Sequence, residues 1–238
     1  MADPHPAAIA NPRSEAFIQS VLDLRLKVAV FDCDGTLWEG DGGKDFLYWE
    51  AQAGLLPQPV AKWALLRYAS YMRAEVDEET MCGEMVTIHA GLPVKDIEAA
   101  AETFVATVIE KRIFPEMQKL VRSLADQGCE IWAVSSTNTW AIEAGVRRFG
   151  IAKERVVAAS VVCKAGTATK ELIRVPTGEG KGIAIREIIR RTPDAVFGNS
   201  VHDAAMLDLA RHPFAINPNP DVVTIARARG WNVYHPLL

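Results

Sequence analysis

Two acidic residues that follow an apolar run are the residues of this chain best suited to chemistry. Val28 to Phe31 has the apolar character of a buried strand, and Asp32 and Asp34 come after it, just before Gly35. Side chains alternate in direction along an extended chain, so both carboxylates leave the same face. At this separation they repel each other unless one is protonated or a cation lies between them. The pair therefore indicates an enzyme that needs a nucleophilic carboxylate, a proton donor and Mg²⁺.

The composition is that of a globular protein without a nucleic-acid or membrane role. The chain has 238 residues, of which 49% are hydrophobic and 24% charged, and this length suits one large domain or one domain with an insert. A net charge of −4 supplies no basic surface for nucleic acid. No apolar run approaches the ~20 residues of a membrane span. We expect neither nucleic acid nor a membrane as a partner.

The cysteines and the N-terminus predict a cytoplasmic protein. The cysteines are Cys33, Cys82, Cys129 and Cys163, which show no CxxC spacing and are expected to be reduced and in or near the core. Residues 1–13 contain prolines and alanines but no basic segment followed by an apolar one, so they are not a secretory signal. We expect them to form a flexible arm.

The elements that must position the two acids begin with a helix over Ser14–Leu24, with Ser14 as a possible N-cap, and a strand over Lys27–Asp32. A long helical region then covers residues 44–111. Breaks at Gly54 and Pro57, at Val76-Asp77, and at Gly91 and Pro93 divide it into about four helices.

Beyond residue 111, strands alternate with helices of about a dozen residues, which is the pattern of a parallel sheet. Helices are predicted at Pro115–Gln127, Asn138–Phe149, Lys181–Arg190, Ala204–Ala210 and Val222–Ala228, strands at Glu130–Val134, Arg155–Ser160, Ala195–Phe197, Phe214–Ile216 and Asn232–Tyr234, and a hairpin within Val161–Val175. We predict an α/β fold with a Rossmann-like parallel sheet, helices on both faces, and a helical cap inserted after the first strand. The core would comprise residues 14–40 and 112–238, and the cap residues 41–111.

Short polar motifs follow the strands or open a helix, in a fixed order. They are Asp32-Cys33-Asp34-Gly35-Thr36, Ser135-Ser136-Thr137-Asn138, Gly178-Glu179-Gly180-Lys181-Gly182 and Gly198-Asn199-Ser200-Val201-His202-Asp203. Parallel sheets carry their active sites at the carboxyl ends of strands, where three of these motifs fall. In motif order, position of the insert and sheet pattern, the chain resembles the haloacid dehalogenase-like hydrolase superfamily, and within it the phosphoserine-phosphatase-like branch.

The resemblance implies a role for each motif. Asp32 would attack phosphorus and become a phosphoaspartate, and Asp34 would serve as general acid and then as general base. Ser135 would hydrogen-bond a phosphoryl oxygen, and Lys181 would neutralise phosphoryl charge. Contacts to phosphate or substrate are expected from Gly35, Thr36, Ser136, Thr137 and His202. Simpler interpretations remain open, since Ser135 to Thr137 can cap a helix, and His202 can be a structural hydrogen-bonder.

The same resemblance implies a Mg²⁺ site formed by Asp32, Asp34 and Asn199, with Asp203 acting from behind the ligands and orienting Lys181. The family usually has an acid directly after the glycine, where this chain has Asn199. An amide oxygen can bind Mg²⁺ but brings no charge. We therefore expect weaker Mg²⁺ binding than an aspartate would give.

The expected function is Mg²⁺-dependent hydrolysis of a small phosphorylated metabolite through phosphoaspartate. A phosphotransferase acting on the same intermediate is one alternative, and a non-catalytic phospholigand-binding relative is another. Phosphoserine is not favoured as substrate, because Met85, beside Glu84, stands near the position where phosphoserine phosphatases carry a carboxylate-binding arginine. Aromatic residues that could line the site are Trp38, Phe46, Tyr48, Trp49, Trp63, Tyr68 and Tyr71, although core positions suit them better. Arg67 and Arg73 could bind a second anion but also suit solvated helix faces. The oligomeric state is not predicted.

Overall fold

A mostly parallel β-sheet forms the centre of the structure, a computed structural model that describes residues 11–238. Within those residues the sheet has seven strands in the order β4-β3-β2-β1-β5-β6-β7. Neighbouring strands run parallel except β3 and β4, which form an antiparallel hairpin at one edge. The strands are β1 (Val28–Phe31), β2 (Glu130–Asn138), β3 (Val156–Lys164), β4 (Thr167–Arg174), β5 (Ala195–Gly198), β6 (His212–Ile216) and β7 (Asn232–Tyr234). The predicted α/β fold is confirmed.

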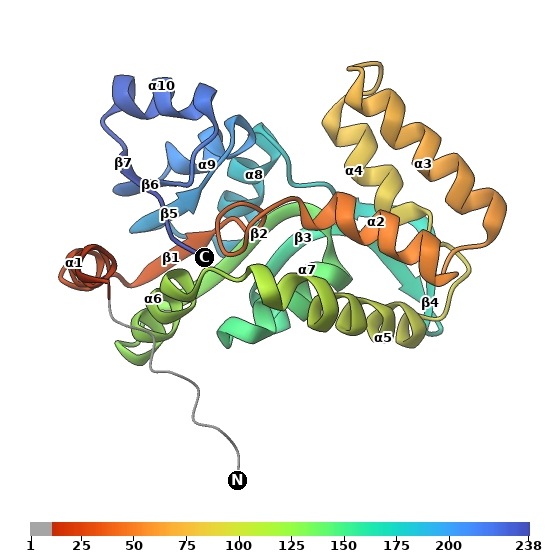
Figure 1. Cartoon of the computed structure of the whole chain (residues 1–238), viewed down its shortest axis with the longest axis horizontal. Helices are drawn as coiled ribbons and strands as arrows, with labels where there is room; N and C mark the ends of the chain where they lie inside the picture. Colours follow the sequence, from red (N-terminus) through yellow and green to blue (C-terminus); the bar gives the residue numbers. More distant parts are fainter. Residues whose placement is uncertain (1–10) are drawn as a thin grey trace, which may run out of the picture.

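Helices cover both faces of this sheet, because its central strand is buried on both sides. Along β1, Ala29 and Phe31 pack into one hydrophobic cluster, and Val28 and Val30 pack into another. The first cluster is covered by α1 (Pro12–Leu22), α5 (Val94–Phe104), α6 (Pro115–Asp126) and α7 (Thr139–Val146), and the second by α8 (Glu179–Ala184), α9 (Ala204–Leu207) and α10 (Pro220–Arg229). Figure 1 shows the two sets on opposite sides of the sheet. Continuous apolar strands, rather than alternating ones, follow from this two-sided burial.

The inserted segment after β1 contains the four predicted helices. They are α2 (Gly42–Ala53), α3 (Gln58–Met72), α4 (Glu78–Thr87) and α5, although α3 and α4 end a few residues before the predicted breaks. The buried residues of α3 belong to a third hydrophobic cluster, whereas those of α5 belong to the main core. Figure 1 accordingly shows α3 standing away from the sheet and α5 lying along it. A single cap over residues 41–111 therefore stays a prediction, since its last helix shares the core of the sheet.

The hairpin of β3 and β4 holds this inserted segment on the sheet. Ala165 and Gly166 form its turn with φ angles of 49° and 75°, a conformation that favours glycine at the second position. The link between α4 and α5 pairs with β4, because the amide of Gly91 donates to the Ala168 carbonyl at 2.9 Å and the amide of Ala168 donates to the Leu92 carbonyl at 3.0 Å. The predicted hairpin thus has a second task as a support for α4.

Some element boundaries differ from the sequence prediction. Helix α1 begins at Pro12, with Asn11 rather than Ser14 as its N-cap, so the predicted arm over residues 1–13 loses its last residues to the helix. The rest of that arm, residues 1–10, lies outside the described residues. Helix α8 ends at Ala184 and continues as a π-helical segment, Ile185–Ile189. These ends depend on capping and packing that periodicity does not reveal.

The remaining bulk predictions concern thiols and membranes. All four cysteines are free thiols; Cys33 and Cys129 are buried, Cys82 is partly buried and Cys163 is exposed. The expectation of a core or near-core position is thus wrong for Cys163, which lies near the tip of the hairpin. No helix within residues 11–238 combines the length and apolar character needed to cross a bilayer.

Candidate active site

A cavity of about 490 Å³ lies at the carboxyl ends of β1, β2 and β5, beneath helices α2 to α4. Every predicted site residue lines it except Thr36 and Asp203. The sheet contributes Asp32, Asp34, Gly35, Ser135, Ser136, Thr137, Asn138, Lys181, Asn199, Ser200, His202, Asn217 and Asn219, and the inserted segment contributes Gly40, Asp41, Gly43, Lys44, Tyr68, Tyr71, Glu78, Met81, Cys82 and Met85. The four motifs, far apart in sequence, therefore meet at one edge of the sheet.

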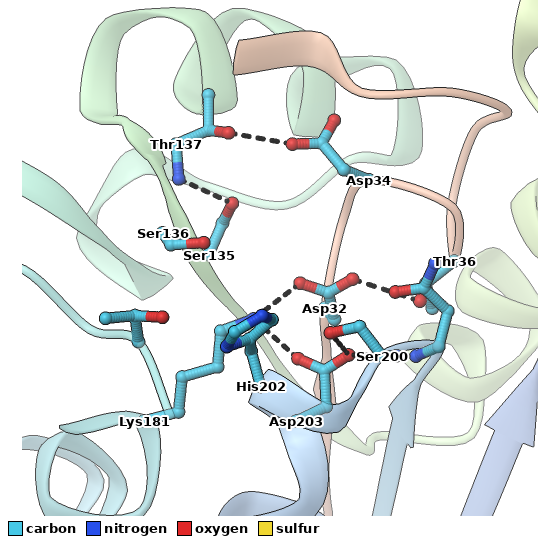
Figure 2. Close-up of polar contacts among 12 residues, drawn as sticks. Asp32, Asp34, Thr36, Ser135, Ser136, Thr137, Lys181, Ser200, His202 and Asp203 are labelled. Carbon is cyan, nitrogen blue, oxygen red and sulfur yellow. Dashed lines mark hydrogen bonds and ion pairs between the residues drawn. The ribbon is translucent and has the colours of Figure 1, made fainter. Parts of the chain in front are cut away.

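Lys181 lies between two carboxylates at the floor of the cavity. Its Nζ donates to Oδ1 of Asp32 at 2.7 Å and to Oδ1 of Asp203 at 2.6 Å, and all three side chains are buried (Figure 2). Thr36 donates its hydroxyl to the other oxygen of Asp32 at 3.1 Å. Thr36 thus orients Asp32 from behind, which differs from the predicted contact with phosphate.

When all three groups are ionised, Asp32 and Asp203 carry two negative charges and Lys181 carries one positive charge. Burial would raise the pKa of Asp203, yet Lys181 and the backbone amides of Ser200 and Asn199 hold that pKa below its usual range. Burial and the charge of Asp203 raise the pKa of Asp32 to about 7, against the pull of Lys181. Burial opposes the charge of Lys181, but the two carboxylates together raise its pKa. A second cation beside Asp32 would restore its ionised, nucleophilic form.

Asp34 is turned away from Lys181 and held by three donors. Its Oδ1 accepts from Trp38 Nε1 and from the Gly42 amide, each at 2.7 Å. Its Oδ2 accepts from Thr137 Oγ1 at 2.8 Å, as Figure 2 shows. Burial and the charge of Asp41 raise the pKa of Asp34 to about 6. A carboxyl group with such a pKa can donate and accept a proton near neutrality. The predicted acid–base role suits this environment better than the predicted role of its carboxylate as a metal ligand.

Strand β2 extends beyond its predicted end at Val134. It runs to Asn138, and its pairing with β3 is irregular between Val134 and Asn138. The next helix begins at Thr139, one residue after its predicted start, with Asn138 as its N-cap. The amide of Thr137 donates to Ser135 Oγ at 3.2 Å. The Ser135 hydroxyl therefore faces the cavity with its own proton free for a phosphoryl oxygen.

Asn199 and Asp32 are the residues present that suit a magnesium ion. A Cβ atom on Gly35 would lie only 2.0 Å from Asn199 Nδ2, so the glycine, with φ of 75°, leaves room for this amide beside the Asp32 loop. Mg²⁺ prefers such oxygen ligands and keeps several waters. Both Asp203 oxygens are already taken by Lys181 and by Ser200 and backbone amides, so Asp203 acts only through Lys181. Within residues 11–238 no group of three His, Cys, Asp or Glu side chains is arranged to hold a metal ion.

Glu78 reaches into the cavity from the first turn of α4 and was not predicted. Its carboxylate accepts from Thr177 Oγ1 at 2.7 Å and from Ser136 Oγ at 3.4 Å, and it pairs with His202 Nδ1. The hydrogen bond and charge of Glu78 raise the pKa of His202. Burial would raise the pKa of Glu78, but His202, Thr177 and the charge of Lys181 lower it overall. Local sequence carries no signal for these contacts, because each partner lies more than fifty residues away.

The aromatic residues mostly belong to the core or the surface. Of those considered, Tyr68 and Tyr71 line the cavity, Trp38 and Phe46 are buried elsewhere, and Tyr48 and Trp63 are exposed. Met85 lines the cavity, and among the described lining residues none is an arginine. Arg67 instead donates to Glu84 at 2.6 and 2.9 Å, and Arg73 pairs with Glu75. The two arginines thus have partners outside the site.

Comparison with known proteins identifies a matching family model and several proteins of similar sequence. The family model of haloacid dehalogenase-like hydrolases matches residues 29–208. Phosphoserine phosphatase SerB1 of Mycobacterium tuberculosis is 26% identical over 246 residues, covering 96% of this chain and 76% of the relative. Histidinol-phosphatase of Neisseria meningitidis serogroup C is 23% identical over 217 residues, covering 87% of this chain and 97% of the relative.

A solved structure supports the fold. A protein of unknown function from Bordetella pertussis Tohama I superimposes with a TM-score of 0.72 at 24% identity, covering 87% of this chain and 97% of the other. At this identity the likeness concerns the fold alone. It includes both the sheet and the inserted helices, because nearly the whole of each chain is covered.

Proposed function

Because the chain belongs to the haloacid dehalogenase-like hydrolases, we propose that it is a Mg²⁺-dependent phosphatase that hydrolyses a small phosphomonoester through a phosphoaspartate on Asp32. The observation that carries this proposal is the buried hydrogen-bonded group of Asp32, Lys181 and Asp203, with Asp34 in the same cavity. Relatives named as phosphatases support the reaction class.

In the proposed reaction, each of the cavity residues has a separate role. Asp32 attacks phosphorus as its ionised form, while Lys181 and the Ser135 hydroxyl neutralise and hold the phosphoryl oxygens. Asp34, with its pKa of about 6, protonates the leaving oxygen and then takes a proton from the water that opens the phosphoaspartate. Thr36 keeps the Asp32 carboxylate in place through its hydroxyl.

Asp32 and Asn199 would hold the magnesium ion, which when bound adds positive charge beside the phosphoryl oxygens. This charge is the one that the pair of Asp32 and Asp203 lacks. The free thiols of the chain suit the reducing cytoplasm that we propose as its location.

We assign substrate selection to the inserted segment 41–111, whose side chains form the outer half of the cavity. Tyr68, Tyr71, Met81 and Met85 offer apolar and aromatic contacts there. No arginine among the described lining residues awaits a substrate carboxylate, and the cation supplied by this segment is the half-exposed Lys44. We therefore favour a small phosphorylated metabolite other than phosphoserine.

Replacing the nucleophile tests the proposal. With p-nitrophenyl phosphate and Mg²⁺, the wild type should release phosphate, and Asp32→Asn should lose at least a thousandfold in kcat, because an amide cannot form the intermediate. Chelation of Mg²⁺ should abolish the wild-type activity, and mass spectrometry of an acid-quenched reaction should find the phosphoryl group on Asp32. No turnover by the wild type across a broad phosphoester screen, or full turnover by Asp32→Asn, would refute the mechanism.

A further inference from the structure

Glu78 joins helix α4 to three segments of the catalytic edge. Its partners are Thr177, which lies shortly before Lys181, Ser136, which follows Ser135 in β2, and His202, which precedes Asp203. The Glu78 side chain is only 16% exposed. A single carboxylate from the inserted segment thus contacts residues next to Ser135 and Asp203 and a residue shortly before Lys181.

The pair of Glu78 and His202 fixes the direction of an imidazole ring. The Nδ1 atom of His202 is engaged by Glu78, so Nε2 is the nitrogen left for a ligand. His202 lines the cavity with its side chain 44% exposed, and its neighbour Asp203 is anchored on Lys181 at 2.6 Å. A carboxylate on one imidazole nitrogen favours the doubly protonated ring, whose other N–H can donate to an anion.

A purely mechanical role for Glu78 is a poorer explanation. Helix α4 is already held by packing, because Met81 and Val86 are buried and a Cβ on Gly83 would lie 3.3 Å from Leu172 and 3.4 Å from Val175. Desolvating a carboxylate only to hold a helix is costly, and an apolar residue of similar size would serve that purpose better. The free-energy cost of burying the Glu78 carboxylate is explained if this carboxylate orients a group that contacts the substrate.

We propose that Glu78 is a positioning residue that holds His202 so that its Nε2 faces the cavity and donates to a phosphoryl oxygen of the substrate. The proposal rests on the phosphatase function above and adds a positioning residue, Glu78, that none of the four motifs contains. It also makes α4 part of the phosphate site, since the helix that forms the outer wall sets the position of a phosphate-binding group.

Glu78→Gln is the first test, and Glu79→Gln is its matched control, because Glu79 is exposed in the same helical turn. Glutamine keeps the size and an acceptor oxygen for Thr177 but loses the charge that orients His202. With p-nitrophenyl phosphate at saturating Mg²⁺, we expect Glu78→Gln to lower kcat/KM by about 10- to 100-fold, the range of one charge-assisted hydrogen bond. Inhibition by orthovanadate should weaken in parallel, while Glu79→Gln should match the wild type in both measurements.

A double-mutant cycle with His202→Ala distinguishes positioning of His202 by Glu78 from a purely mechanical role of Glu78 in holding α4. If Glu78 acts through His202, the double variant should be no slower than His202→Ala alone, and the melting temperatures of Glu78→Gln and Glu79→Gln should agree within a few degrees. Independent, multiplying losses in the cycle would overturn the proposal. So would equal activity of Glu78→Gln and Glu79→Gln, or an activity loss that follows a lowered melting temperature and disappears on cooling.

Failure of the phosphatase function itself would be recognised separately. In that case the wild type would hydrolyse no phosphomonoester, whereas failure of the positioning role leaves wild-type activity intact and sensitive to Asp32→Asn. Calorimetric binding of inorganic phosphate then provides a readout that needs no turnover. Weaker phosphate binding by Glu78→Gln than by Glu79→Gln would support the role of Glu78, and equal binding would refute it.

Discussion

At the scale of single residues, the site is defined by how few positive charges face its carboxylates. Lys181 is shared by Asp32 and Asp203, and Asp203 is better served because two backbone amides and a hydroxyl also donate to it. Asp32 is left as the carboxylate that needs another cation. Asn199, placed beside Gly35, can give that cation an oxygen but no charge. Metal affinity should therefore be limited at Asn199.

Asn199→Asp should strengthen Mg²⁺ binding, because a second carboxylate beside Asp32 adds one full charge to the metal site. We expect the Mg²⁺ concentration that gives half-maximal activity to fall by about tenfold, equivalent to about 1.4 kcal/mol. Calorimetric titration with Mg²⁺ provides the same comparison without substrate. Asn219→Asp is the matched control, since Asn219 lines the same cavity and the substitution adds the same charge. An equal change in both variants, or none in Asn199→Asp, would contradict a ligand role for Asn199.

At the scale of elements, the position of Glu78 depends on how α4 begins. Asp77 caps this helix, because its Oδ1 accepts from the Thr80 amide at 2.8 Å and its Oδ2 accepts from the Thr80 hydroxyl at 2.7 Å. The next residue is Glu78, so the cap fixes the turn from which the carboxylate enters the cavity. A local capping interaction is thereby linked to the geometry of a distant loop.

Asp77→Ala should reduce the free energy of unfolding by about 1 kcal/mol through the lost cap, whereas Asp77→Asn should retain most of it, since asparagine caps equally well. Because the first turn then frays, kcat/KM of Asp77→Ala should also fall, by less than that of Glu78→Gln. Urea unfolding and steady-state kinetics measure the two effects. If Asp77→Asn is as destabilised as Asp77→Ala, the side-chain hydrogen bonds do not hold the helix start.

The same elements show what the sequence could and could not predict. The end of α2 follows from Gly54, and the starts of α3 and α5 follow from Pro57 and Pro93, because these residues act locally on the backbone. The extension of β2 to Asn138 depends on β3, which offers pairing partners beyond the predicted strand. Glu78 escaped prediction for a similar reason, since its role lies in contacts between distant segments. Asp32, at the end of β1, and Lys181, in the first turn of α8, belong to motifs that the sequence shows locally, and both line the cavity.

At the scale of the whole molecule, a second buried charged group couples the inserted helices to the sheet core. Glu50 of α2 contacts His89 Nε2 at 2.7 Å, and the two side chains are 1% and 0% exposed. His89 follows α4 and stacks near Phe46 and Trp140, the latter on α7. This pair lies away from the catalytic cavity, so its ionisation should affect global stability more than turnover.

Glu50→Gln should alter how stability depends on pH. Burial raises the pKa of Glu50 in the folded protein, against the opposing effect of His89. The folded state therefore binds this proton more tightly, and its contribution to stability is complete below the ordinary glutamate pKa and is lost as pH rises through the raised value. Glutamine does not ionise, so the free energy of unfolding of Glu50→Gln relative to wild type should increase between about pH 4 and pH 7. Urea unfolding across this range measures the difference, and Glu79→Gln, at an exposed position, should show no such trend. A difference independent of pH, or one that moves the other way, would mean that burial does not raise the pKa of Glu50 in the folded protein.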